Sequence, residues 1–442
     1  MTDSTPASPV AITGLGVFSP IGIGADAVLE SLTARRSGIR KVEALDYLAS
    51  PGGVGGYIDG FDDKSAKKQY LRPLKRSIKV MCREIQFGSA AALQALETSG
   101  IAIEGVTEGD HEIDHSRFGI DYGANLMFSP PSELQDAVWN CRDDEHNFHE
   151  AEWGDDGFPK MFPLWLLKYL PNMPSCHISI AADARGPSNS ITQDEASLGL
   201  AMGEAQRIIN RGQADVMIAG ATGTRLHPVK TMHSLLWDNL ADGPGEPHQW
   251  CRPFERDRRG EVIAEGAGAF IFETPAAAEK RGATVYGRLL GSGSSCVVDR
   301  DGTPRYGQAV ENAIRSALRD AGVEAGDLGH VNAHGSGDRA VDRQEAAGIL
   351  AALGSAGPDM PVTALKSYFG NAGSGSGPVE VAGSLLALRE GVIPATLNYE
   401  TPDPDCPLNV VAGDHRPTDN KLFLKVSVTR VAQASAIVIE AA

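Results

Sequence analysis

The chain has 442 residues, which is enough for about two or three domains and a large hydrophobic core. Hydrophobic residues make up 42% of the chain and charged residues 22%, so the composition excludes a disordered or fibrous protein. The net charge of −17 repels nucleic acid and anionic membrane surfaces, and neither is an expected partner.

The sequence also bears on where the protein works. It has no run that approaches the ~20 apolar residues needed to span a bilayer, and its first residues lack the pattern of a signal peptide. The six cysteines are scattered without a CxxC pair, which is typical of reduced thiols. We therefore expect a cytoplasmic protein with no membrane span.

Strand and helix patterns alternate along the chain. A buried strand over 10–16 enters a glycine turn, and a helix follows from about 26 to 35. Further helices are predicted over 78–98, 196–211, 310–321 and 379–388, and further strands over 117–123, 214–220, 285–290, 330–334, 422–428 and 436–440. This alternation predicts an α/β protein with parallel strands covered on both faces.

A domain boundary is predicted near Pro275, which divides the chain into halves of 1–273 and 274–442. Residues from about 128 to 155 have prolines, acids and tryptophans without a clean period. That texture indicates a surface insertion that serves as a lid or as a partner surface.

Three short motifs are weaker than they first look. His111–His115 matches the HExxH zinc pattern, but acids and glycine precede it and a strand follows, so no helix is expected there and no metal site is predicted. Gly14–Gly16 lacks the rest of a dinucleotide-binding fingerprint. The glycine-rich stretch 370–378 suits either a phosphate cradle or a tight packing turn.

Several ordered segments together resemble the β-ketoacyl-acyl-carrier-protein synthases. They are 12–17, 170–180, 184–187, 252–260, 265–268, 331–335, 387–398 and 400–405. The resemblance covers nearly the whole chain apart from the insertion. It implies a thiolase-like fold, in which two similar βαβαβαββ halves form a five-layer α-β-α-β-α sandwich that is usually dimeric.

The resemblance also implies a set of catalytic residues, and this sequence differs from that set at two positions. Family members condense acyl thioesters on an acyl carrier protein, with a cysteine at a helix amino terminus and two histidines. Glu195 stands at the cysteine position, His334 keeps the first histidine, and Asn371 replaces the second. Lys366 keeps its place, and Glu380, Asp342 and Glu345 are expected to brace the floor of the site.

Glu195 has two interpretations. The pattern Thr192-x-x-Glu195 is a capping box, in which both side chains satisfy free N–H groups of the following helix. Alternatively, Glu195 is a buried catalytic carboxylate, which would need a partner. We expect that partner to be Arg430, from the altered loop 426–435, or His334.

Contacts with substrate and carrier protein are expected at two further places. Thr429, Arg430 and Phe369 are predicted to contact the substrate. A basic run is predicted to dock the acyl carrier protein; its residues are Lys67, Lys68, Arg72, Lys75 and Arg76. The carrier protein would deliver the 4′-phosphopantetheine arm, and no other cofactor is expected. A solvated helix face explains the same charges equally well.

The altered site leads to a function in fatty acid or polyketide synthesis without condensation. The chain resembles a chain length factor, a subunit that lacks the cysteine and pairs with a Cys-containing ketosynthase. A second interpretation is an acyltransferase-family enzyme or malonyl decarboxylase that uses Glu195 and His334. A third is a homodimer that only binds acyl thioesters.

Overall fold

The computed structural model describes residues 6–43 and 50–442. In the first half of the chain, five strands of the large sheet lie side by side in the order β1 (Val10–Ser19), β8 (Glu265–Glu273), β7 (Val216–Thr224), β5 (Phe118–Ala124) and β6 (Ser188–Ile191). Strands β5, β6 and β7 are parallel, whereas β8 runs antiparallel to its neighbours β1 and β7.

The second half repeats this arrangement. Its strands lie in the order β9 (Gly287–Cys296), β16 (Gln433–Ala441), β15 (Leu422–Val428), β10 (His330–Asn332) and β11 (Pro361–Thr363), with β13 (Asn409–Val410) at the edge. In both halves the first strand lies beside the last strand of that half. The two halves form one sheet because β1 pairs with β9. The chain therefore consists of two similar α/β halves.

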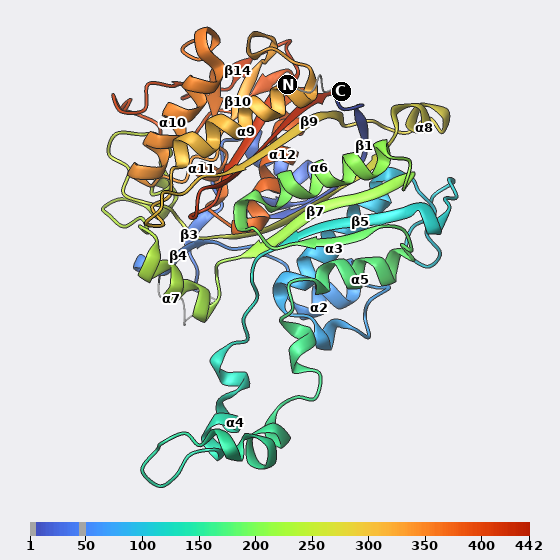
Figure 1. The fold of residues 1–442 in the computed structure, drawn as a ribbon, viewed down its shortest axis with the longest axis vertical. Coiled ribbons are helices and arrows are strands. Elements are labelled where there is room, and N and C mark those ends of the chain that lie inside the picture. Colours follow the sequence, from blue (N-terminus) through green and yellow to red (C-terminus); the bar gives the residue numbers. More distant parts are fainter. Residues whose placement is uncertain (1–5, 44–49) are drawn as a thin grey trace.

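Helices cover both faces of each half, which gives five layers (Figure 1). Helices α3 (Arg83–Ser99) and α5 (Met173–Ala182) form one outer layer, and α9 (Tyr306–Ala321) and α10 (Arg339–Leu353) form the other. Helices α6 (Ser197–Asn210) and α12 (Ser376–Arg389) contact strands of both halves and form the middle layer. All of α12 except Arg389 is buried, which explains why every other residue of the helix except Glu380 is apolar or small.

Shorter elements surround this core. They are β2 (Gly22–Ile23), α1 (Ala25–Thr33), β3 (Ile39–Lys41), β4 (Val54–Gly56), α2 (Asp63–Ser65), α4 (Gln135–Asn140), α7 (Pro228–Trp237), α8 (Pro275–Lys280), α11 (Lys366–Phe369), β12 (Val392–Ile393) and β14 (Arg416–Pro417). Across the described residues, every helix falls short of the length and apolar character that a bilayer crossing requires.

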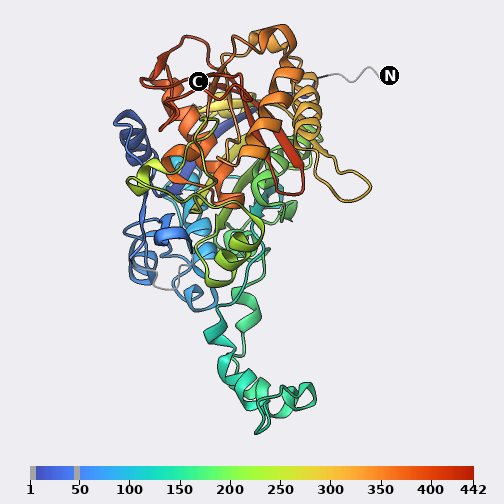
Figure 2. The ribbon, with the colours of Figure 1, turned by 90° about the vertical axis from the view of Figure 1, so that its left-hand side faces the viewer.

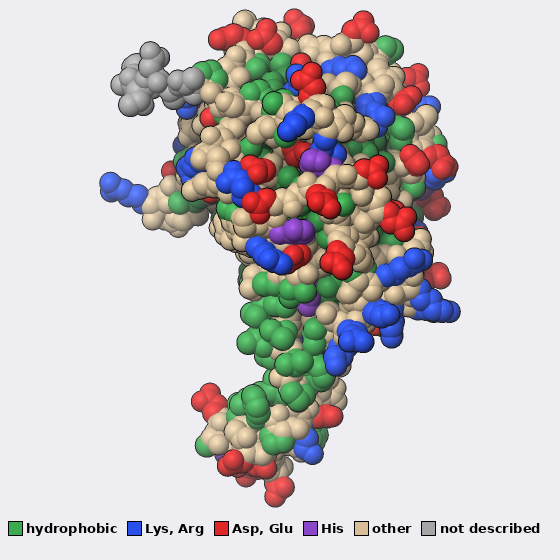
Figure 3. Space-filling view, turned by 90° about the vertical axis from the view of Figure 1, so that its right-hand side faces the viewer, with side chains coloured by type: hydrophobic (Ala, Val, Ile, Leu, Met, Phe, Trp, Pro, Cys, Tyr) green, Lys and Arg blue, Asp and Glu red, His purple; other side chains and the backbone are tan. Residues whose placement is uncertain are grey.

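The segment between β5 and α5 leaves the body as an arm that carries α4 near its far end (Figures 1 and 2). Short helical turns make up much of the arm, and Leu126, Phe158 and Leu166 are exposed along it. Figure 3 shows hydrophobic side chains over the stem of the arm, and Lys and Arg side chains on the body beside it.

The predicted elements occur, with differences at their ends. Helix α3 begins at Arg83 because 78–80 form a separate 3₁₀ turn. Helix α12 begins at Ser376, three residues before its predicted start, because the glycine-rich stretch continues directly into it. The same stretch packs tightly, and a Cβ on Gly375 would lie 2.0 Å from the carbonyl oxygen of Gly266. Of the two alternatives for 370–378, a phosphate cradle or a tight packing turn, the structure has the packing turn.

This close approach predicts a large loss of stability in Gly375→Ala. The new methyl group meets backbone atoms of β8, which cannot move aside, so we expect the free energy of unfolding to fall by about 2–4 kcal/mol. Urea denaturation of both chains measures the change. Gly326→Ala is the matched control because nothing lies within 4 Å of its Cβ, and equal losses in the two variants would contradict the packing argument.

Candidate active site

A cavity of about 430 Å³ lies where the two halves meet, and Glu195, His334 and Asn371 line it together. The first half contributes the start of α6 and the ends of β7 and α7, and the second half contributes the loops after β10, α11 and β15. The fold therefore brings Glu195 and Asn371 into contact although they are 176 positions apart in the sequence.

Local structure holds Glu195 at this cavity. It lies in a 3₁₀ turn, Asp194–Ala196, that continues into α6, and only 9% of it is exposed. Asp194 has a left-handed backbone (φ 38°), which makes a sharp entry into the helix. The Ser435 hydroxyl donates to the carbonyl of Ala196, so the turn is tied to β16 of the other half.

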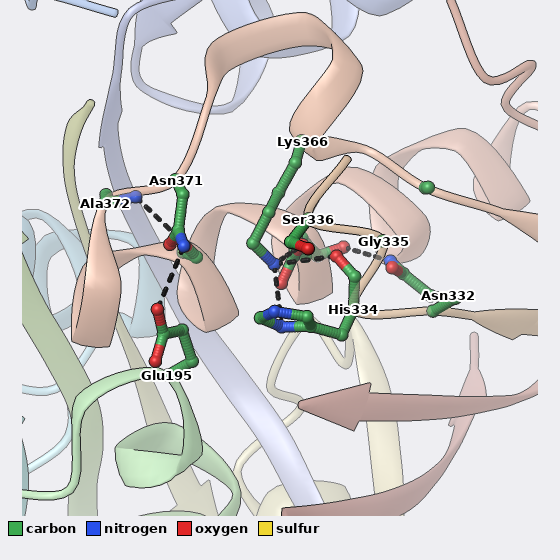
Figure 4. Close-up of polar contacts among 12 residues, drawn as sticks. Glu195, Asn332, His334, Gly335, Ser336, Lys366, Asn371 and Ala372 are labelled. Carbon is green, nitrogen blue, oxygen red and sulfur yellow. Dashed lines mark hydrogen bonds and ion pairs between the residues drawn. The ribbon is translucent and has the colours of Figure 1, made fainter. Parts of the chain in front are cut away.

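The side chain of Asn371 links two carboxylates, and Figure 4 shows its contact with Glu195. Its Nδ2 donates to Oε1 of Glu195 at 2.9 Å and to Oε2 of Glu261 at 2.7 Å. Its Oδ1 accepts from the backbone N–H of Gly373 and from the hydroxyl of Ser376, so the amide has one possible orientation. An amide in this position bridges two acids but cannot transfer a proton between them.

Arg225 supplies a positive charge to the same cluster. Its guanidinium contacts the carboxylates of Glu261 and Asp238 and the hydroxyl of Ser234. Two carboxylates thus share one guanidinium, while Glu195 has no ion pair among the described residues.

Burial is the main reason that the pKa of Glu195 rises from 4.5 to about 7. The carboxylates of Asp194 and Glu261 raise the pKa further, whereas the positive charge of Arg225 and the hydrogen bond from Asn371 lower it. Glu195 therefore changes its protonation state near neutral pH.

His334 is held as a neutral hydrogen-bond donor at the opposite part of the cavity (Figure 4). Lys366 Nζ lies 2.9 Å from the His334 carbonyl oxygen, 2.7 Å from Glu380 Oε1 and 3.3 Å from His334 Nδ1. An ammonium group has three donors and no acceptor, so Nδ1 accepts and the ring proton is on Nε2. Burial and the charge of Lys366 hold the pKa of His334 well below its usual value.

The residues expected at the floor of the site surround the His334 loop. Glu345 accepts from the backbone N–H groups of His334 and Gly335, and Asp342 accepts from those of Ser336 and Gly337. Glu380 lies between Lys366 and Lys425. Glu345 and Asp342 thus position the loop by hydrogen bonds to its backbone, and Glu380 acts on it through Lys366, which donates to the His334 carbonyl.

The predicted capping box is wrong. The 3₁₀ turn has Gln193, not Thr192, at its N-cap, and no side-chain hydrogen bond caps it or α6. The expected partners of Glu195 are also wrong. Arg430 lies 3.9 Å from Asp238 and over the ring of Trp237, His334 hydrogen-bonds to Lys366, and the partner of Glu195 is Asn371.

The predicted substrate contacts differ from one another. Thr429 and Arg430 line the cavity, but Phe369 is fully buried in the central hydrophobic core and lies outside the cavity wall. Its ring packs among apolar residues because α11 turns it inward, so a substrate contact of Phe369 is not supported. The five predicted docking residues are all exposed.

The sequence analysis missed Arg225, Glu261 and Asp238. A usable signal was present for Arg225, because a charged residue that directly follows a fully buried strand at the edge of a predicted site is a candidate site residue. Glu261 reaches Asn371 because Ile263 and Asn371 form a β-bridge, a contact between distant segments that no local pattern shows.

The paired α/β halves and the cavity between them define the chain as a thiolase-like ketosynthase fold. Family models for the β-ketoacyl synthase N-terminal domain and C-terminal domain match residues 7–278 and 286–400. The chain therefore belongs to the β-ketoacyl synthase family, and the resemblance found in the sequence is confirmed.

Individual relatives agree with this membership. The chain is 31% identical over 403 residues to the tetracenomycin polyketide synthase ketoacyl synthase alpha subunit of Streptomyces glaucescens, covering 91% of this chain and 90% of that one. A solved type II polyketide synthase acyl carrier protein in complex with its ketosynthase, bound to the hexaketide, has a TM-score of 0.80 at 25% identity and covers 99% of this chain and 100% of its own. The ishigamide ketosynthase/chain length factor shares the fold with a TM-score of 0.81, at 24% identity and the same coverage.

The raised pKa of Glu195 predicts how Glu195→Gln changes stability with pH. Between pH 4.5 and about 7 the folded chain binds the Glu195 proton and the unfolded chain does not, so this group costs stability as the pH rises. Glutamine keeps the hydrogen bond from Asn371 and removes that cost. From pH 5 to pH 8 we expect the variant to gain about 2–3 kcal/mol relative to the unmodified chain.

Urea denaturation at intervals of one pH unit measures this difference. Other buried acids titrate in both chains, so they cancel when the two curves are subtracted. A difference that stays constant from pH 5 to pH 8 would contradict a buried, titrating Glu195.

Proposed function

We propose that this chain is a non-condensing partner of a Cys-containing β-ketoacyl synthase, comparable to a chain length factor. It would act on acyl chains that an acyl carrier protein delivers in fatty acid or polyketide synthesis. The observation that carries the proposal is the state of the nucleophile position, where Glu195 is held by the Asn371 amide.

Neither replacement supports condensation. An acyl group on a carboxylate is an anhydride, which is far more labile than a thioester and does not last as a carried intermediate. The Asn371 amide donates both of its N–H groups to carboxylates and has no proton to exchange near neutral pH. Carbon–carbon bond formation would then take place in the partner chain.

The acyl chain itself would still reach the cavity. We assign Thr429 and Arg430 to contact with it, since both line the cavity from the loop after β15. The cofactor involved would be the 4′-phosphopantetheine of the acyl carrier protein, so the chain needs none of its own.

The basic residues beside the arm support docking of an acidic carrier protein. Lys67, Lys68, Arg72, Lys75 and Arg76, which we call the basic patch, are exposed in a chain whose net charge is −17. A cluster of one sign on an oppositely charged protein directs a complementary partner to one face.

Charge reversal in the basic patch tests this docking. We expect Arg72→Glu with Lys75→Glu to weaken binding of acyl carrier protein about tenfold or more at low salt, with a smaller effect at high salt because exposed charges are screened. Isothermal titration at two salt concentrations measures it. Arg211→Glu with Lys280→Glu is the control, since both residues are exposed elsewhere, and equal effects of the two pairs would remove the docking site.

The arm and the edge of the sheet support a partner chain. Phe158, Phe162, Leu164 and Leu166, which we call the apolar stem, are 63%, 44%, 45% and 54% exposed. Contiguous apolar surface of this kind marks an interface in soluble proteins. Strand β6 is the free edge of the sheet in the first half, and its backbone is open to pairing.

Coexpression tests the partner directly. We expect the chain to purify as a one-to-one complex with a Cys-containing synthase, and Phe158→Glu with Leu166→Glu to break that complex because charges replace apolar contacts. Light scattering after gel filtration measures the stoichiometry. Val298→Glu, at a 50% exposed site away from the arm, should leave the complex intact, and a chain that stays alone with such a synthase would contradict the proposal.

A stand-alone decarboxylase is the second candidate, because His334 still presents a hydrogen-bond donor to an open cavity. The isolated chain would then release carbon dioxide from malonyl carrier protein, using Glu195 and His334. Release that is lost in His334→Ala would favour this enzyme over the non-condensing partner.

A further inference from the structure

The wall of the cavity carries more acids than bases. Five acids and three bases line it. The acids are Asp194, Glu195, Asp238, Glu261 and Asp338, and the bases are Arg225, Lys230 and Arg430. Arg225 is shared between two of these acids, and Lys230 is occupied by Glu84 at 2.6 Å, which lies outside the wall. A negative group that enters the cavity therefore meets a surplus of negative charge, and a positive group is attracted.

Glu195 is a buried acid of the wall that keeps one carboxylate oxygen free for a ligand. Its Oε1 accepts from Asn371, and its Oε2 has no hydrogen-bond partner among the described residues. The side chain is nine-tenths buried and lines the cavity. A buried carboxylate without an ion pair is strongly stabilised by a cation that donates a hydrogen bond to it.

His334 gives a second, independent indication of what the cavity holds. Only 3% of it is exposed, its Nδ1 is occupied by Lys366, and its Nε2–H has no acceptor in the described part of the chain. A buried N–H donor that faces a cavity fits a carbonyl oxygen of a ligand. A ligand that carries both a carbonyl group and a cationic donor would satisfy His334 and Glu195 together.

The mouth of the cavity already accommodates a positive charge. The guanidinium of Arg430 lies 4.9 Å from the centre of the Trp237 ring, and His233 packs against the same ring at 4.7 Å. Aromatic faces attract cations and repel carboxylates. Arg430 already covers this ring and lies 3.9 Å from Asp238, so the charge preference of the cavity rests on its acids and not on this ring.

We propose that this cavity binds an aminoacyl group, whose carbonyl oxygen accepts from His334 Nε2 and whose protonated amine donates to Glu195 Oε2. This inference rests on the proposed function, because it names the kind of acyl chain that a carrier protein would deliver. A malonyl group, which ends in a carboxylate, is the substrate that such a cavity excludes.

Stable amides test the preference without a carrier protein or a synthase. The probes are the β-alanyl, butanoyl and malonyl amides of N-acetylethylenediamine, which match in length and end in an ammonium, a methyl and a carboxylate. Titration calorimetry of the full chain at pH 7.5 measures their affinities. We expect the β-alanyl amide to bind about tenfold or more tightly than the butanoyl amide, and the malonyl amide to bind most weakly.

Variants locate the preference at Glu195. Glu195→Gln should reduce the ratio between the β-alanyl and butanoyl amides to about one or two, because the neutral amide no longer holds the ammonium. Asparagine adopts the left-handed conformation that Asp194 has, so Asp194→Asn should leave the backbone unchanged. This variant should reduce the ratio less than Glu195→Gln, because it removes a neighbouring charge and not the contact with the ammonium. Glu279→Gln, an exposed change on α8, should leave the ratio as it is.

Equal affinities for the three amides, tighter binding of the malonyl amide, or no binding of any of them would each overturn the aminoacyl proposal. An unchanged ratio in Glu195→Gln would overturn it as well. Because no partner protein is present in this experiment, loss of the proposed complex with a synthase and loss of the aminoacyl preference are separate results.

Discussion

The site depends on the amide of Asn371, which stands between the carboxylates of Glu195 and Glu261. Two buried acids this close to one amide would repel each other if both were charged and if nothing else compensated them. The amide donates one N–H to each, and the guanidinium of Arg225 neutralises Glu261 from the other side. This arrangement keeps a polar cluster at the place where the family carries its nucleophile.

The rest of the site is held in place around His334 by buried ion pairs and hydrogen bonds. Lys366 and Glu380 set the tautomer of His334, and Glu345 and Asp342 hold the backbone of its loop. A loop fixed in this way presents a donor to the cavity at a constant position, which suits the binding of a carbonyl group. The loop therefore keeps a fixed binding geometry on the cavity that Glu195 also lines.

Particular residues show how far sequence reasoning reached into this site. The family resemblance implied His334, Lys366, Glu380, Asp342 and Glu345 as site residues, and they lie together. The partner of Glu195 was predicted incorrectly because two candidates were chosen for their charge and position in the chain. The observed partner is the amide of Asn371, whose direction is set by Gly373 and Ser376, and side-chain direction is not encoded in spacing.

The sequence by itself determined the alternation of strands and helices and the α/β class, because these depend on residue type and local periodicity. Only the tertiary structure decided which charges face the cavity. Arg225, Asp238 and Glu261 belong to the same half as Glu195 but come from other elements of it, whereas Asn371, His334 and Arg430 come from the second half and reach the cavity because the two halves close on one another. Electrostatic balance in a buried cavity is a sum over such distant groups, so it appears only when the chain is folded.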